Sequence, residues 1–251
     1  MFKILLATKN KGKIKEIKEI FSDLPVALVE IPETDTDEVE EDGISYFENA
    51  LKKAKYYALK YNLPALADDS GLEIKVLNGV PGIYSSRFLG KDTSFDKKMA
   101  EILHILDGVE DRRARFYCVA VLYDPKSNKY FTAEGECDGE ILKEPHKKEG
   151  FGYDPIFKPT GYDKSFSELG VEIKNQISHR RKAFEKMKAI IQEEFLGGDA
   201  IEIKINGKKL DADKYVYDVF ESVILALLGT LKDIPEIRKV EITIEKNNGK
   251  E

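Results

Sequence analysis

Several features are scarce in this sequence of 251 residues, and each scarcity argues against a class of protein. No apolar run approaches the roughly 18 residues of a membrane-spanning helix. The apolar start Phe2–Ala7 is too short for a signal peptide and continues into lysines. Cys118 and Cys137 are too few for a disulfide framework and lack metal-ligand spacing. We therefore expect a soluble, cytoplasmic protein with reduced, half-buried cysteines and no membrane partner.

A basic excess is also missing. The chain has 40 Lys and Arg against 46 Asp and Glu, a formal net charge of −6 at pH 7. Domains that coat nucleic acid usually carry a clear positive charge, so any basic site must be local and we expect no nucleic-acid partner. Tryptophan is absent, but 42% of the residues are hydrophobic. This length and composition fit one large α/β domain, or a domain of roughly 200 residues with a small appendage.

The order of the expected elements predicts an α/β fold. Short apolar or alternating segments indicate strands, and apolar residues at helical spacing indicate amphipathic helices. A loop is predicted over Gly150–Gly161, where glycine and proline are dense. The predicted strands are Phe2–Ala7, Val26–Ile31, Leu66–Val76 with a polar interruption at Asp68–Gly71, Arg115–Tyr123 and Tyr130–Asp138; the predicted helices are Lys13–Phe21, one from a capping box at Ser45 to Tyr61, Phe95–Leu106 and Ser178–Phe195.

The paired glycines Gly197-Gly198 predict a domain boundary. We expect a main domain over residues 1–196 and a small α+β appendage over residues 199–251, with a ββαβ or βαβ pattern. In this appendage Asn206-Gly207 is typical of a hairpin turn, and an apolar helical stripe runs from Tyr215 to Leu231. Because a unit of about 50 residues buries little surface, we expect it to pack on the main domain or on a second subunit.

A basic turn, Thr8-Lys9-Asn10-Lys11-Gly12-Lys13, follows the first predicted strand. It lies at the start of a helix, where unpaired backbone N–H groups and the positive end of the helix dipole favour an anion. The turn lacks the G-x-x-x-x-G-K-[ST] pattern of a Walker A loop. A phosphate site is therefore predicted from location and charge alone, and a solvated basic turn is the alternative interpretation.

Two adjacent carboxylates, Asp68 and Asp69, interrupt an apolar strand. Neighbouring strand residues point to opposite faces, so one of the two can point into a cleft. Mg²⁺ prefers such hard oxygen ligands and completes its shell with water and substrate phosphate. Glu41 is the candidate second ligand; the rest of the acidic segment Glu33–Asp42 is interpreted as a solvated, mobile loop, and Glu48 as a helix cap.

Two further segments have the composition of a ligand site. Ser178-His179-Arg180-Arg181-Lys182 places cations on the first turn of a helix, against the usual preference for acidic residues there. A bound anion or an electron-rich ligand would offset this charge, and a solvated basic face is the alternative. Phe151-Gly152-Tyr153-Asp154-Pro155 offers an aromatic ring for stacking, a glycine for close approach and a carboxylate, although such rings are more often part of a core.

In combination these motifs resemble the inosine triphosphate pyrophosphatase family, also called XTP/dITP diphosphatases. The resemblance covers residues 1–196 and keeps the family's order of motifs. Glu149 departs from the family, which often has a second glycine before the phenylalanine, and the extension after Gly197 has no counterpart. The matching stretches are Thr8–Lys13, Glu41-Asp42-Gly43 with Phe47–Ala50, Leu66–Leu72, Pro81–Arg87, Gly150–Phe157, and Lys174-Asn175 with Ser178-His179-Arg180.

The resemblance implies a homodimeric, Mg²⁺-dependent enzyme that hydrolyses non-standard purine nucleoside triphosphates (ITP, dITP and XTP) to the monophosphate and pyrophosphate. It also implies a long, curved mixed sheet flanked by helices, in two lobes around a central cleft. Glu41 and Asp69 would hold the metal, and Asp69 would also accept a proton. Ser70 would touch the substrate. The implied phosphate contacts are Thr8, Lys9, Asn10, Lys11, Gly12 and Lys13. The implied contacts to the base and sugar are Phe151, Gly152, Tyr153, Asp154, Lys174, His179 and Arg180.

We predict that Asp69 activates water for attack on the α-phosphorus, and that Lys13 with the helix N-terminus stabilises the departing pyrophosphate. Selectivity for a 6-oxo purine follows if Arg180 donates to that oxygen. A hydrolase of modified pyrimidine triphosphates would use the same phosphate and metal groups. A binding module for nucleotides or nucleic acid, with residues 199–251 as its arm, is the other alternative; nine Lys and Arg against eleven Asp and Glu in the arm argue against nucleic acid.

Overall fold

The computed structural model describes residues 2–146 and 152–196, and parts of the chain between residues 204 and 230. The chain divides into two units, Met1–Gly197 and Gly198–Glu251. In the described part of the chain, no helix is long and apolar enough to cross a membrane.

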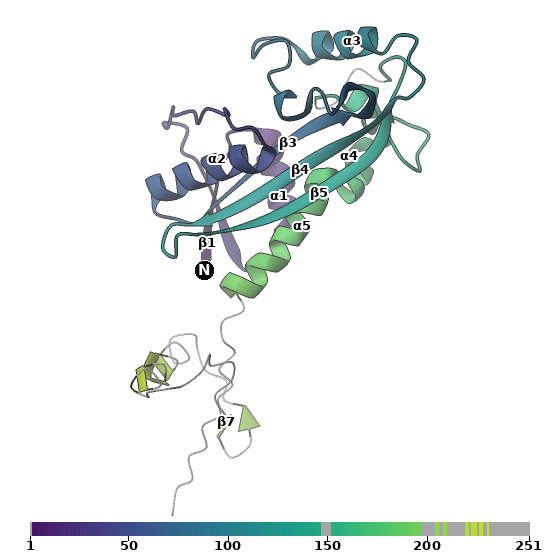
Figure 1. Cartoon of the computed structure of the whole chain (residues 1–251). Coiled ribbons are helices and arrows are strands. Elements are labelled where there is room, and N and C mark those ends of the chain that lie inside the picture. Colours follow the sequence, from purple (N-terminus) through teal and green to yellow (C-terminus); the bar gives the residue numbers. More distant parts are fainter. Residues whose placement is uncertain are drawn as a thin grey trace, which may run out of the picture. The chain divides into compact units, whose positions relative to one another are not determined.

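A six-stranded mixed sheet in the order β2-β1-β3-β4-β5-β6 forms the frame of the first unit (Figure 1). Strands β2, β1 and β3 run parallel and are joined by helical crossovers. The pairs β3–β4, β4–β5 and β5–β6 are antiparallel. The long hairpin of β4 and β5 curves along the sheet. The predicted α/β fold with a long, curved mixed sheet is confirmed. The strands are β1 (Phe2–Leu6), β2 (Val26–Glu30), β3 (Ala65–Ile74), β4 (Arg113–Asp124), β5 (Lys129–Ile141) and β6 (Phe157–Pro159).

Helices cover both faces of this sheet. Leu5 of β1 and Ala7, which directly follows the strand, pack towards α2, whereas Ile4 and Leu6 pack with α1 and α5, because successive strand residues alternate between faces. A third core joins α3 and α4 to the other end of the β3–β5 strands. The helices are α1 (Lys11–Ile20), α2 (Tyr46–Tyr61), α3 (Phe95–Ile105), α4 (Phe166–Ile177) and α5 (His179–Ile191), with the short turns η1 (Lys75–Leu77), η2 (Gly82–Tyr84), η3 (Asp154–Ile156) and a π-helical end η4 (Gln192–Leu196).

Strand β3 is continuous through its polar stretch, so the predicted interruption at Asp68–Gly71 is wrong. Its pairing with β4 runs without a gap from Ala65↔Tyr123 to Ile74↔Ala114. The carboxylates are tolerated because both have polar partners, described below. Gly71 is needed for a packing reason, since a Cβ there would lie 2.1 Å from the carbonyl oxygen of Gly82.

Helix α4 and strand β6 were not predicted from the sequence. Helix α4 begins at a capping box in which Ser165 and Glu168 each bind the other's backbone N–H, and this pattern was present in the sequence. The predicted loop Gly150–Gly161 contains η3 and the short edge strand β6. Its Pro159 is compatible with a strand because it lies at the edge of the sheet, where a missing N–H costs no ladder bond.

The second unit is described only in part. Strands β7 (Lys204–Ile205) and β8 (Lys208–Lys209) form an antiparallel pair on either side of Asn206-Gly207. Helical residues occur between 219 and 227, and their exposed apolar side chains are Val219, Phe220, Val223 and Leu227. The rest of the predicted ββαβ or βαβ pattern and the glycine boundary lie outside the described residues, so the domain assignment stays a prediction.

Candidate active site

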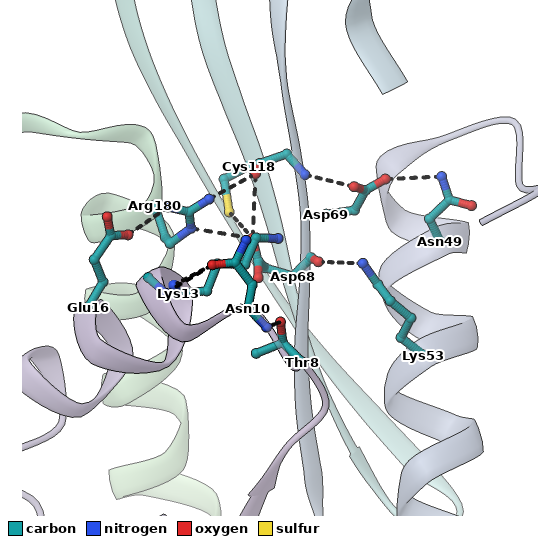
Figure 2. Close-up of polar contacts among 12 residues, drawn as sticks. Thr8, Asn10, Lys13, Glu16, Asn49, Lys53, Asp68, Asp69, Cys118 and Arg180 are labelled. Carbon is teal, nitrogen blue, oxygen red and sulfur yellow. Dashed lines mark hydrogen bonds and ion pairs between the residues drawn. The ribbon is translucent and has the colours of Figure 1, made fainter. Parts of the chain in front are cut away.

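The turn between β1 and α1 is organised by Asn10, the N-cap of α1. Its side-chain oxygen accepts the backbone N–H groups of Gly12 at 3.0 Å and Lys13 at 3.2 Å, and the Thr8 hydroxyl accepts the N–H of Asn10 at 3.2 Å (Figure 2). An Asn at this position stabilises a helix start. The expectation that these N–H groups are unpaired is therefore wrong for Gly12 and Lys13.

The three lysines of this turn differ in their surroundings. Lys9 donates to the carbonyl oxygen of Asp37 at 2.7 Å, and Lys11 is exposed. Lys13 forms an ion pair with Asp68, with 2.9 Å between Nζ and Oδ2. The basic turn is thus tied to β3 through Lys13, and its positive charge at this point is partly balanced by a buried carboxylate.

Asp68 lies at the centre of a buried charge cluster on the α1 and α5 side of β3 (Figure 2). Its side chain is 1% exposed and pairs with Lys13 and, at 3.4 Å, with Arg180. Burial opposes ionisation, but Lys13, Arg180 and Lys53 outweigh it and hold the pKa of the Asp68 carboxyl well below its ordinary value. Arg180 also donates to Glu16 at 2.6 Å and to the Ser70 hydroxyl at 3.2 Å. The cationic start of α5 therefore includes a buried network at Arg180, rather than only a solvated face.

Asp69 points to the opposite face of β3. One carboxylate oxygen accepts the side-chain N–H of Asn49 at 3.0 Å, and the other accepts the backbone N–H of Ser70 at 2.9 Å. Burial, with Glu41 as a nearby like charge, raises the pKa of the Asp69 carboxyl despite the opposing effect of Lys53. A carboxylate with a raised pKa is a better proton acceptor near neutral pH than an ordinary aspartate.

Glu41 completes the charged site on this face. It forms ion pairs with Lys53 and, at 3.5 Å, with Arg87. Burial opposes ionisation, but Lys53, Lys13 and Arg87 hold the pKa of the Glu41 carboxyl below its ordinary value. Asp69 and Glu41 together offer carboxylate oxygens, the ligand type that suits Mg²⁺, which takes one or two carboxylates and fills its shell with water and phosphate oxygens. Among the residues with described positions, no group of three or more His, Cys, Asp or Glu could hold a metal ion.

Three residues of this site received no role from the sequence. Asn49 and Lys53 lie four residues apart on α2 and contact Asp69 and Glu41 respectively, while Arg87 follows the turn η2. A signal existed for the helix pair, because a polar side chain and a lysine at i and i+4 share one helix face. Arg87 could be placed only by the fold, since 46 residues separate it from Glu41.

The residues predicted to contact the base and sugar are mostly buried. Tyr153 is 2% exposed, packs edge-on against Phe95 and donates to the carbonyl oxygen of Ser85 at 2.8 Å. Lys174 and Asp154 form an ion pair. Gly152 has a φ of 65°, which favours glycine, and Phe151 lies outside the described residues. The structure gives Tyr153 a packing role, and base contact by this segment stays a prediction.

His179 stacks on Phe116, with 4.8 Å between ring centres and 13° between planes. Burial, together with Arg180 and Lys174, lowers its pKa well below the ordinary value, so the imidazole is neutral at pH 7. Its Nδ1 atom is buried and has no hydrogen-bond partner among the described residues. A neutral ring with an unpaired nitrogen is compatible with the predicted ligand contact.

The acidic segment is fixed to α2, so its interpretation as a solvated, mobile loop is wrong for two residues. Lys60 pairs with both Asp35 and Asp37 at 2.7 Å. Tyr61 donates to Asp35, and Tyr56 to Asp37. Glu48 caps the start of α2 as interpreted, but its side chain accepts the N–H of Ile44 at 2.9 Å rather than that of the N-cap Ser45, so the predicted capping box is only half formed.

The sequence is similar to known proteins over most of its length. The profile of the Ham1 family matches residues 4–190. The chain is 46% identical over 187 residues to a dITP/XTP pyrophosphatase of Desulfotalea psychrophila (74% of this chain, 83% of the relative), and 43% identical over 199 residues to one of Aquifex aeolicus (76% and 96%).

Solved structures show the same likeness. A HAM1 protein from Coxiella burnetii superposes with a TM-score of 0.72 and 38% identity, covering 77% of this chain and 100% of that one. The Ham1 protein of Staphylococcus aureus gives a TM-score of 0.70 and 39% identity, with coverage of 76% and 99%. The match spans the residues that carry the charge cluster, the two candidate metal ligands and α5, and on this ground the chain belongs to the Ham1 family.

Proposed function

We propose that this chain is a Mg²⁺-dependent nucleoside-triphosphate pyrophosphatase that hydrolyses dITP, XTP and ITP to the monophosphate and pyrophosphate. The proposal rests mainly on one observation: the side chains of two adjacent aspartates lie on opposite faces of β3 and have different partners there. Asp68 is bound by Lys13 and Arg180, whereas Asp69 has a raised pKa and lies near Glu41. The names of the relatives, dITP/XTP pyrophosphatases, support the substrate class.

The described residues suit hydrolysis at the α-phosphorus. Mg²⁺ held by Glu41 and Asp69 would neutralise phosphate charge and polarise the reacting phosphoryl group. The Asp69 carboxylate would accept the proton of the attacking water, and burial together with Glu41 raises its pKa in the free protein. Lys13 and the N-terminus of α1 stabilise the charge that develops on the departing pyrophosphate.

Arg180 supports the preference for a 6-oxo purine. Its three described bonds, to Asp68, Glu16 and Ser70, fix the guanidinium plane. A guanidinium has five N–H donors, so donors remain for the oxygen at position 6 of the base. The 6-amino group of ATP would leave such a buried donor unpaired, which costs about 1–3 kcal/mol.

A product assay tests the proposal. The protein is incubated with Mg²⁺ and, in separate reactions, ITP, dITP, XTP, GTP, ATP and a pyrimidine triphosphate, and the phosphorus products are identified by ³¹P NMR. We expect pyrophosphate and the monophosphate, with ITP, dITP and XTP turned over at least tenfold faster than the others. Release of orthophosphate, turnover of pyrimidine nucleotides alone, or equal rates with ATP and GTP would exclude the proposed function.

We also propose that the enzyme is cytoplasmic, in keeping with its two free cysteines, and that it is a homodimer, as the family resemblance implies. Light scattering of the full chain and of a version that ends at Gly197 measures whether the second unit takes part in assembly. An active dimer without residues 198–251 would exclude an assembly role for that unit, and a monomer for the full chain would exclude the homodimer.

A further inference from the structure

Asn49 links the two halves of the candidate metal site. It belongs to the first turns of α2 and is 0% exposed. Its side-chain N–H donates to Oδ2 of Asp69 at 3.0 Å, and its side-chain oxygen accepts the backbone N–H of Gly43 at 2.8 Å. Gly43 lies two residues after Glu41, so one buried amide binds both the Asp69 carboxylate and the turn that carries Glu41.

The orientation of this amide is determined by its partners. Asp69 offers only acceptors when ionised, and the backbone N–H of Gly43 offers only a donor. The reversed amide would place its oxygen against the carboxylate and its N–H₂ against the N–H, so both bonds would be lost. Asn49 is therefore held in one orientation, and it fixes the rotation of the Asp69 carboxylate in turn.

The turn itself is attached closely to α2. The N–H of Ile44 donates to Glu48 at 2.9 Å, and the N–H of Glu48 donates to the Ser45 hydroxyl at 3.1 Å. A Cβ at position 43 would lie 2.7 Å from Oδ1 of Asn49 and 2.8 Å from Cβ of Glu48. Glycine at this position lets the backbone approach close enough for the amide to reach it.

A second contact from the same helix face completes the arrangement. Lys53, one turn after Asn49, pairs with Glu41 and donates to the backbone oxygen of Asp68 at 2.8 Å. Helix α2 thus binds Glu41 through the Lys53 ammonium group and Asp69 through the Asn49 amide. Because 28 residues separate the two carboxylates in the sequence, α2 is the element that sets their relative position.

We propose that Asn49 is a positioning residue that holds Asp69 and the Glu41 turn in the relative geometry needed to bind one divalent cation. The inference rests on the proposed function, and it assigns no chemical step to Asn49 itself. Residues that orient metal ligands typically contribute 10–100-fold to metal affinity or activity, and we expect an effect of this size.

The test compares variants by metal binding and by turnover. Asn49→Leu removes both hydrogen bonds at similar volume, Asn49→Gln keeps the amide but lengthens the side chain, and Gly43→Ala keeps Asn49 but displaces the turn. Tyr61→Phe is the control, since it removes a hydroxyl from the same helix away from Asp69. Binding of Mn²⁺ without nucleotide is measured from the EPR signal of the free ion, and thermal unfolding checks that each variant folds.

We expect the Kd for Mn²⁺ to rise by about 10–100-fold in Asn49→Leu and by about tenfold in Gly43→Ala. Asn49→Gln should lie between Asn49→Leu and the unchanged protein, and Tyr61→Phe should stay within twofold of it. At saturating Mg²⁺ the KM for dITP should change by less than threefold while kcat falls. Such a split, with partial rescue by glutamine, distinguishes positioning of the site from general loss of structure.

Folded variants at both positions with the Mn²⁺ affinity and kcat of the unchanged protein would overturn the inference. If Asn49→Leu does not fold, Gly43→Ala and Asn49→Gln decide the question by the same criterion. A failure of the proposed function has a different signature, because the unchanged protein would then release no pyrophosphate from dITP.

Discussion

Asp68 and Asp69 are neighbours on β3, yet the two faces of the strand treat them in opposite ways. On the α1 and α5 side, Lys13 and Arg180 lower the pKa of Asp68, so this carboxylate acts as the counter-charge of a buried network. On the α2 side, burial and Glu41 raise the pKa of Asp69, which is bound by neutral donors. The two faces of β3 thus give neighbouring aspartates opposite pKa shifts, and the proposed function assigns the chemical role to Asp69.

The largest expected effect comes from Asp69→Asn, which removes the proton acceptor but keeps the shape. General-base catalysis typically contributes about 10²–10⁴-fold, so kcat should fall by at least about 10²-fold. Pyrophosphate release gives kcat, and calorimetry with ITP checks that the nucleotide still binds. Unchanged turnover would show that Asp69 is not the proton acceptor, and the proposed functional difference between Asp68 and Asp69 would then fall away.

Asp68→Asn should instead act mainly on stability. It leaves the half-buried Lys13 and the buried Arg180 without their shared carboxylate, and breaking a buried ion pair from one side typically costs about 3–5 kcal/mol. Urea unfolding at pH 7 measures this loss. A change below about 1 kcal/mol would show that the network tolerates a neutral group, and the two faces would then differ less than their contacts indicate.

Opposite pH dependences sharpen the contrast further. The folded-state pKa of Asp68 is lowered, so its stabilisation is present above the unfolded value near 3.8 and is lost as pH falls through the folded value. The pKa of Asp69 is raised, so its ionisation costs stability at neutral pH and this cost disappears in acid. Asp69→Asn should therefore raise Tm at pH 7.

The measurement is thermal unfolding of both variants and the unchanged protein from pH 7 to pH 3. The difference caused by each substitution should shrink as the pH falls, with opposite signs for Asp68→Asn and Asp69→Asn. If both substitutions changed Tm in the same direction, the opposite pKa shifts assigned to Asp68 and Asp69 would be contradicted.

The smallest expected effect concerns the thiols. Cys118 faces Asp68 at 3.9 Å and is 0% exposed; burial and Asp68 raise its pKa, and burial raises the pKa of Cys137 to about 11. Both cysteines are free and buried rather than half-buried. Neither should react with a disulfide reagent at pH 8 until urea is added. Rapid labelling of Cys118 in the native protein would show that solvent reaches the Asp68 face.

Much of the frame was predictable because local patterns determine it. Alternation and turn residues placed the β4–β5 hairpin, and helical spacing placed α1, α2 and α3 to within a few residues. The continuity of β3 was missed because charged residues in a strand were interpreted as a break, whereas tertiary ion pairs compensate them. Helix α4 was missed although Ser165 and Glu168 form a capping box, because Gly170, with a φ of 79°, divides its pattern.

The family resemblance was confirmed. Several of its motifs lie far apart in the sequence but contribute residues that contact one another in the fold. Lys13, Asp68, Ser70 and Arg180 come from three separate motifs and contact one another. The roles of Asn49, Lys53 and Arg87 depend on distances between segments that local patterns do not encode. Burial of Tyr153 likewise follows from its contact with Phe95 and Ser85, which only the fold brings together.

Arg180 binds a residue far from it in the sequence, and this affects the order in which the charge network forms during synthesis. Its bond to Glu16 joins residues 164 positions apart, whereas Lys13 and Asp68 are 55 apart. Since chains emerge from the ribosome N-terminus first at about 5–20 residues per second, β1, α1 and β3 are made several seconds before α5. Before α5 is made, Asp68 has only Lys13 of its two ion-pair partners. The charge network is completed once α5, which carries Arg180, has been synthesised.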